Sequence, residues 1–190
     1  HTLILITLIQ VSSLQAQDPC SSDNPDMPGT DICIYVHEVV TGAEYLEDGE
    51  AEVKIYISTN IPIYSFSFTL EGFDNVLSAN SYSIQPDCLA WSFFGGDNIN
   101  INENYFYGGA GNGGSVIPII EEGEFLSVIA TYNPILDDGD SYFLTFKEVI
   151  PGMNGNGTNF MNEDQQSITH TFIPRTWEIG HNQTFNYVGH

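Results

Sequence analysis

Residues 63–70 have the sequence Ile-Tyr-Ser-Phe-Ser-Phe-Thr-Leu, in which large apolar side chains occupy every second position from Tyr64 to Leu70. The positions between them, from Ser65 to Thr69, carry small hydroxyl side chains. Successive side chains of a β-strand point to opposite faces of its sheet, so this alternation predicts one buried face and one polar face. Such a strand is typical of a sheet that covers a core on one side only. The segment therefore indicates an all-β fold.

Short apolar or alternating runs of the same kind recur along the chain, between groups of Gly, Asn and Asp that are typical of turns. Besides residues 63–70, they predict strands at Ile32–Val40, Ala51–Ser58, Val76–Ile84, Leu89–Phe94, Ile99–Tyr107, Val116–Ile120, Phe125–Tyr132, Tyr142–Val149 and Ile168–Ile173. No stretch combines helical periodicity with capping residues. About ten strands at regular turn spacing predict a two-sheet β-sandwich of the jelly-roll type, which we assign to residues 32–175.

Three stretches carry a resemblance to a known family. Asn60–Phe73, NIPIYSFSFTLEGF, places a Phe-x-Phe strand after a short polar turn. Gly123–Tyr132, GEFLSVIATY, leads from a glycine into a core strand, and Tyr142–Gly152, YFLTFKEVIPG, supplies the strand after it. Over residues 32–152 the chain thus resembles cohesin-like and carbohydrate-binding-like β-sandwich modules of exported bacterial proteins. The resemblance implies a cohesin-like fold and binding through a sheet face, as cohesins bind dockerins, but it assigns no binding residue.

The charge of the chain excludes two classes of partner. Twenty-five acidic residues stand against Lys54, Lys147 and Arg175, which gives a formal net charge of -22. A surface of this kind repels the phosphates of nucleic acids and the headgroups of anionic lipids. We therefore expect neither nucleic acid nor a membrane surface among its partners.

The N-terminal segment, residues 1–17, has two interpretations. Residues 2–11, TLILITLIQV, are almost continuously apolar but too short to span a bilayer. With Ala16 before a cleavage point and Gln-Ala-Gln at 15–17, the segment resembles a Bacteroidota signal peptide. Alternatively it is a strand, apolar on both faces, that completes the sheet of a neighbouring copy. The side chains of that assembly strand would be Leu3, Ile4, Leu5, Ile6, Leu8, Ile9 and Val11. Both interpretations predict export to the extracellular space or the cell surface, with no membrane insertion.

Residues 18–31 form a polar linker loop that Cys20 and Cys33 bracket. A disulfide between these two cysteines would stabilise the loop by roughly 3 kcal/mol through lost chain entropy. Cys88 would then remain a buried or unpaired thiol. In the alternative, all three cysteines are reduced. Residues 176–190 follow the sandwich as a C-terminal strand or linker.

Several residues are candidates for ligand contacts. Tyr105 and Tyr107 share one face of a predicted strand beside a Gly-rich loop, so they are candidates for stacking on sugars. Trp91 and Trp177 are further exposed-ring candidates, although Phe93 and Phe94 after Trp91 favour core packing. The candidate metal ligands for a structural Ca²⁺ are Asp137, Asp138 and Asp140, whose sequence is also that of a plain hairpin turn.

Two triplets, at Asn156 and Asn182, fit the pattern for N-linked glycosylation. The sequence carries no Gly-x-Ser-x-Gly, His-Glu-x-x-His or P-loop motif, so we expect no enzyme and no cofactor beyond Ca²⁺ or covalent glycans. The leading hypothesis is an extracellular structural subunit that polymerises head-to-tail into a filament by donating residues 2–11. The alternative is a cohesin-like module that binds a polysaccharide or a partner protein for a larger cell-surface protein.

Overall fold

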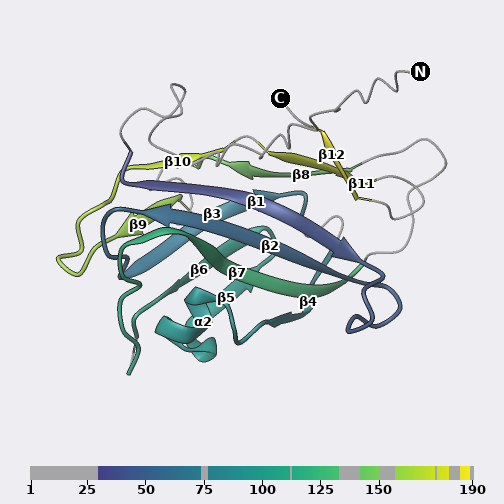
Figure 1. The fold of residues 1–190 in the computed structure, drawn as a ribbon, viewed down its shortest axis with the longest axis horizontal. Coiled ribbons are helices and arrows are strands. Elements are labelled where there is room, and N and C mark those ends of the chain that lie inside the picture. Colours follow the sequence, from purple (N-terminus) through teal and green to yellow (C-terminus); the bar gives the residue numbers. More distant parts are fainter. Residues whose placement is uncertain are drawn as a thin grey trace, which may run out of the picture.

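The apolar faces of the strands meet between two β-sheets in the computed structural model of this chain (Figure 1). In Figure 1, β1 and β2 of one sheet lie over β3 and β6 of the other. The structure describes residues 30–73, 77–111, 113–132, 142–149, 157–173, 175–179 and 185–188.

The first sheet has five strands in the order β10-β1-β2-β7-β4. Their bounds are His170–Phe172 (β10), Ile32–Thr41 (β1), Glu50–Thr59 (β2), Ile120–Tyr132 (β7) and Leu77–Ile84 (β4). β10 runs parallel to β1, and the other neighbours are antiparallel. The long pairing of β2 with β1 and β7 forms the centre of this sheet.

The second sheet has seven strands, six of them in the order β12-β11-β8-β3-β6-β5, with β9 paired to β3 beside that path. Their bounds are Phe185–Val188 (β12), Thr176–Ile179 (β11), Tyr142–Lys147 (β8), Ser65–Glu71 (β3), Tyr105–Gly109 (β6), Ile99–Asn102 (β5) and Asn159–Met161 (β9). Residues 176–190, which the sequence assigns to a strand or linker, thus include β11 and β12, and β11 pairs with β8.

The core is rich in phenylalanine. Phe66 stacks edge-on against Phe125 of the other sheet, with ring centroids 4.9 Å apart, and Phe68 stacks on Phe106 at 5.2 Å. Phe66, Phe68 and Leu70 are at most 3% exposed, whereas the hydroxyl side chains between them are partly exposed. This pattern confirms the strand predicted at residues 63–70 and, with the two facing sheets, the predicted all-β sandwich.

Three predicted strands are wrong in detail. Val116–Ile120 is not a strand: Ile117 forms an isolated bridge with Ile63, and Ile120 is the first residue of β7. Leu89–Phe94 forms a short helix, α2, in which Ala90 and Phe94 are buried. These two side chains are four residues apart and therefore share one helical face, a spacing that a six-residue apolar run does not distinguish from a strand. Ile99–Tyr107 is not one strand but a hairpin of β5 and β6, because Glu103 adopts a φ of 56° and reverses the chain.

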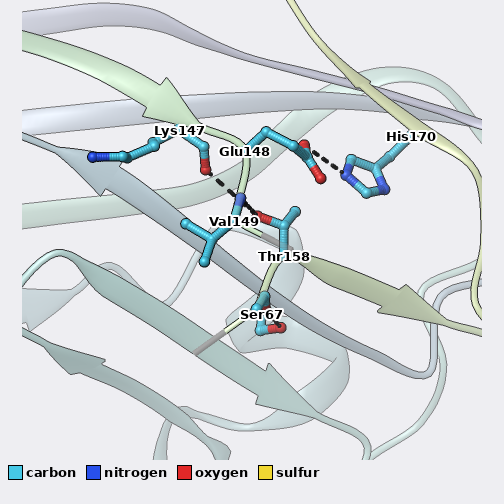
Figure 2. Close-up of polar contacts among 7 residues, drawn as sticks. Ser67, Lys147, Glu148, Val149, Thr158 and His170 are labelled. Atoms are coloured by element: carbon cyan, nitrogen blue, oxygen red, sulfur yellow. Dashed lines mark hydrogen bonds and ion pairs between the residues drawn. The ribbon is translucent and has the colours of Figure 1, made fainter. Parts of the chain in front are cut away.

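The sequence also missed β9, which polar contacts hold against the second sheet (Figure 2). Thr158 is 2% exposed; its backbone N–H donates to the Val149 carbonyl at 2.8 Å, and its Oγ1 accepts from the Val149 N–H at 3.1 Å. Ser67 Oγ donates to the Gly157 carbonyl at 2.7 Å, so both residues before β9 are anchored. His170 forms an ion pair with Glu148 at 3.2 Å when its ring is protonated. The contacts of Gly157 and Thr158 thus hold the start of β9 beside β3, with which it pairs.

Candidate functional site

The outer face of the second sheet gathers uncharged polar side chains around two tyrosines. The strand register aligns Asn100 of β5, Tyr107 of β6, Ser67 of β3 and Asn159 of β9 in one row across the sheet. Because side chains alternate along a strand, all four lie on the face opposite the phenylalanine core. Three segments distant in sequence, namely β3, the β5–β6 hairpin and β9, therefore contribute to one surface.

Tyr105 and Tyr107 stack on each other, with ring centroids 5.4 Å apart and an interplanar angle of 27°. Tyr105 thus covers one face of the Tyr107 ring. The next residue of β6 on the same side of the sheet is Gly109, which has no side chain. Tyr107 is 40% exposed, and both Tyr107 and Gly109 belong to the lining of one hollow.

A shallow hollow of about 530 Å³ lies beside this ring, and we call it the Tyr107 hollow. Its lining includes Tyr107, Gly109, Gly111, Ser65, Asn98 and Asn100. Asp97 also lines it and carries its one carboxyl group. Its walls therefore combine a planar ring with amides and hydroxyls.

Glycine is required in this lining because neighbouring atoms approach the backbone closely. A Cβ atom at Gly109 would lie 2.8 Å from Cβ of Ser65, and one at Gly111 would lie 2.6 Å from Oδ1 of Asn98. Real Cβ contacts of this length do not occur without a shift of the neighbour. The two glycines therefore allow Ser65 and Asn98 to approach the backbone of the lining closely.

Two polar side chains of the hollow, Asn98 and Ser65, differ in their hydrogen bonding. Asn98 donates from Nδ2 to the Phe94 carbonyl at 2.6 Å, which fixes the orientation of its amide and leaves Oδ1 beside Gly111. The hydroxyl of Ser65 is buried and has no hydrogen-bond partner. Unpartnered buried polar groups are uncommon in folded proteins because each one costs desolvation energy. The hollow thus offers the Asn98 acceptor to a polar ligand, whereas the Ser65 hydroxyl is enclosed by the protein.

The outer face of the first sheet carries a different cluster, in which charged groups bind each other. Glu52 of β2 is 5% exposed and accepts hydrogen bonds from Ser127 and Tyr45, both at 2.5 Å. Lys54 lies 3.8 Å from Glu52 and 3.0 Å from Glu38. A hydrogen bond to Glu38 is the main cause that raises the pKa of Lys54, and one to Glu52 raises the pKa of Tyr45.

A bulge between Val36 and Glu38 places His37 beside this cluster. The His37 ring stacks on Tyr56 with centroids 4.1 Å apart, and its Nδ1 is buried without a partner. Burial lowers the pKa of His37. The negative charges of Glu38 and Glu122 oppose that shift, whereas the positive charge of Arg175 adds to it. The Arg175 guanidinium lies 4.2 Å from the ring centroid of Tyr35.

Among the predicted site residues, Tyr105 and Tyr107 lie together on the exposed face of β6. Trp91 is 36% exposed on α2, whereas Trp177 packs against the core and donates from Nε1 to the Val36 carbonyl at 3.4 Å. Cys88 is a free, buried cysteine whose pKa is raised by burial. Cys33 is buried and takes part in an interaction. Cys20 lies outside the described residues, so a disulfide between the two stays a prediction.

The other predicted site residues lie outside the described part of the chain. They are the assembly strand (Leu3, Ile4, Leu5, Ile6, Leu8, Ile9 and Val11), the candidate Ca²⁺ ligands Asp137, Asp138 and Asp140, and the glycosylation candidates Asn156 and Asn182. Within the residues that the structure describes, no group of three or more His, Cys, Asp or Glu side chains is arranged to hold a metal ion. No helix found there is long and apolar enough to cross a membrane.

Sequence reasoning missed Ser65, Asn98 and Gly109 as members of the hollow. The alternation in residues 63–70 placed Ser65 on the outer face, but only the register of β3 with β6 sets it beside Gly109. Asn98 belongs to a 3-10 turn, Gly96–Asn98, for which strand alternation offers no signal.

Comparison with known proteins gives matches in structure alone. No protein-family model matches the sequence, and no curated protein matches it. Among solved structures, the chain is similar to the cohesin of the Coh-OlpA-Doc918 type I cohesin–dockerin complex from Clostridium thermocellum, with 13% identity, a TM-score of 0.47 and coverage of 77% of this chain and 97% of that chain. It is also similar to the seventh ScaB type I cohesin from Pseudobacteroides cellulosolvens, with 17% identity, a TM-score of 0.40 and coverage of 76% and 89%. These structures are cohesin modules, the family that the sequence resembles.

Proposed function

We propose that this chain is a non-catalytic binding module whose ligand is a neutral polysaccharide held in the Tyr107 hollow. The observation that carries the proposal is the 40% exposed ring of Tyr107 in the lining of the hollow, together with the amides of Asn98 and Asn100. A planar ring packs on the apolar C–H face of a sugar, and amides and hydroxyls exchange hydrogen bonds with its hydroxyl groups.

Charge favours a neutral ligand over an anionic one. The chain carries a formal net charge of -22, and no lysine or arginine lines the Tyr107 hollow to offset it. An anionic polysaccharide would therefore be repelled on approach. Asp97 can still accept hydrogen bonds from the hydroxyl groups of a neutral sugar.

The composition of the hollow also supports binding without catalysis. Hydrolysis of a glycosidic bond ordinarily requires two carboxyl groups on opposite sides of the bond that breaks. Asp97 is the single carboxyl-bearing residue among those lining the Tyr107 hollow. A sugar seated there would be bound but not cleaved.

The test is a binding assay on insoluble cellulose, xylan and mannan, with polygalacturonate as the anionic comparison. We expect retention on at least one neutral polymer and none on polygalacturonate. Tyr107→Ala should weaken retention about tenfold, which corresponds to about 1.4 kcal/mol. Phe143→Ala is the matched control, because Phe143 is 49% exposed on β8 and does not line the hollow. The proposal would be refuted if none of the neutral polymers retained the protein. Full retention of Tyr107→Ala with an unchanged melting temperature would refute it as well.

A partner protein is the second candidate ligand for the same sheet face. The observation that favours it is the second exposed ring, Phe143, which alternation in β8 places on the outer side of the sheet that contains Tyr107. A protein would cover both rings, because protein interfaces are larger than one sugar site. Loss of binding in both Phe143→Ala and Tyr107→Ala would favour this candidate, whereas loss in Tyr107→Ala alone favours the polysaccharide.

Polymerisation through residues 2–11 is a separate hypothesis that rests on the sequence, since those residues lie outside the described part. Deletion of residues 1–17 should abolish polymers and leave the sandwich folded if donated strands link the copies. Size-exclusion chromatography of the full chain and the deletion variant distinguishes the outcomes, and unchanged assemblies after deletion would rule that hypothesis out.

A further inference from the structure

A second hollow adjoins the first one. It lies at the end of α2, has about 520 Å³, and is lined by Trp91, Gly95, Gly96, Gly113 and other residues; we call it the Trp91 hollow. Asp97 and Asn98 line both hollows, so the two are neighbours on either side of these residues. We infer that they are two subsites for one extended chain of neutral sugars, an inference that rests on the proposed function of the Tyr107 hollow.

The position of Trp91 supports the second subsite. A Cβ atom at Gly96 would lie 2.2 Å from Cζ3 of Trp91, so the indole lies directly on the backbone of Gly96. The ring is 36% exposed although Ala90 and Phe94 of the same helix are buried. α2 therefore holds one large ring out of the core and places it directly on the Gly96 backbone.

The wall between the hollows is polar and rigidly held. The backbone N–H of Asn98 donates to the Gly95 carbonyl at 3.0 Å, and its side chain donates to the Phe94 carbonyl at 2.6 Å. These two bonds fix the amide where both hollows meet. Asp97 beside it adds a carboxylate that can accept hydrogen bonds from either side.

Two aromatic rings with polar residues between them suit a linear sugar chain. Successive sugars each present an apolar face and a rim of hydroxyl groups, so one sugar can pack on Tyr107, another on Trp91, and the link between them can pass Asp97 and Asn98. A single sugar would occupy one hollow and leave the other ring exposed. Asp97 is also the single carboxyl-bearing residue among the described residues that line the Trp91 hollow, so the described lining of the two hollows supplies no second carboxyl group for hydrolysis.

The test is titration calorimetry of the full chain with cello-, xylo- and manno-oligosaccharides, from the disaccharide upward. We expect affinity to rise with chain length and then to level off once both hollows are filled. Trp91→Ala should lower affinity for the long oligosaccharides about tenfold and leave the disaccharide unaffected. Tyr107→Ala should lower affinity for both, and Phe143→Ala for neither.

Tryptophan fluorescence gives a second readout on the unmodified protein. Trp91 and Trp177 are the two tryptophans of the chain, and Trp177 packs against the core outside both hollows. A long oligosaccharide should shift the emission of Trp91, and the disaccharide should not. This measurement decides the question even if Trp91→Ala lowers the melting temperature.

The outcomes separate the inference from the proposed function. If Tyr107→Ala weakens binding while Trp91→Ala and chain length have no effect, the polysaccharide site stands and the second subsite is wrong. If no oligosaccharide binds at any length and none of the insoluble neutral polymers retains the protein, both are wrong. If long chains bind more tightly but leave the fluorescence unchanged, the extension does not run over Trp91 and the inference is overturned.

Discussion

The two outer faces of the sandwich arise from the same strand alternation but differ in how their polar groups are used. On the first sheet, Glu52 accepts hydrogen bonds from Ser127 and Tyr45 and lies close to Lys54, so these groups bind each other. On the second sheet, Tyr107, Asn98 and Asn100 line a hollow, and the Tyr107 ring is 40% exposed. The first arrangement stabilises the fold, and the second leaves interactions available for a ligand.

The largest effect is expected for a substitution that breaks the hydrogen-bond network of the first face. Glu52→Ala removes the acceptor of two side-chain hydrogen bonds and leaves the buried hydroxyl of Ser127 without a partner. We expect the free energy of unfolding to fall by about 2 kcal/mol. Urea denaturation measures the loss, and polysaccharide binding of the folded variant should be unchanged. A loss of binding by the folded variant would show that the two faces are coupled.

An intermediate effect is expected at Asn98, which belongs to the binding face but also has a structural role. Asn98→Ala removes the bond to the Phe94 carbonyl, so the free energy of unfolding should fall by about 1 kcal/mol. Affinity for a long oligosaccharide should fall as well, because Asn98 lines both hollows. Asn100→Ala is the matched control: it should reduce affinity and leave stability within about 0.5 kcal/mol of wild type. Equal stability losses in the two variants would contradict the role assigned to the Asn98 amide.

A smaller effect is expected from His37 of the first face on the pH dependence of the free energy of unfolding. Because the pKa of His37 is lowered in the folded state, the unfolded chain binds more protons, and His37 makes the protein less stable as pH falls through 6.5. The raised pKa of Glu124, caused by burial, acts in the opposite direction in its own range above 4.5. The difference between wild type and His37→Gln isolates the histidine effect.

Thermal unfolding between pH 7.5 and pH 5.5, a range about one unit to each side of the usual histidine pKa, measures that difference. We expect wild type to lose more stability than His37→Gln as pH falls. Binding should change little, because no histidine lines either hollow. Parallel stability curves for the two proteins would mean that His37 does not titrate differently on folding.

The smallest effect is expected for the ion pair on the second face. Lys147 lies 2.8 Å from Glu71, and both side chains are 53% exposed. Exposed pairs contribute little because solvent screens them, so Lys147→Ala should change the free energy of unfolding by no more than about 0.5 kcal/mol. Lys54→Ala, on the first face, should cost more, since the Lys54 side chain is 22% exposed and lies near two carboxylates. If urea denaturation shows that Lys147→Ala and Lys54→Ala lower the free energy of unfolding equally, the ion pairs of the two faces do not differ in strength.

Sequence periodicity was sufficient for the strands whose two faces differ in polarity. The alternation from Tyr64 to Leu70 identified the core side of β3, because burial of Phe66 and Phe68 and exposure of the hydroxyls between them follow from the two-residue repeat. The same repeat placed Tyr105 and Tyr107 on one face of β6. It failed at Leu89–Phe94, where a short, mostly apolar run fits either a strand or a helix.

By itself, the sequence therefore determined an acidic all-β sandwich, the inward and outward sides of its clearest strands, and the two tyrosines of the candidate site. Only the tertiary structure decided what stands next to those tyrosines. Ser65, Gly109 and Asn98 meet beside Tyr107 because of strand register and a turn after α2, and these contacts join residues far apart in the chain. Periodicity along one strand carries no information on register between strands, which depends on how all the apolar faces fit into one core.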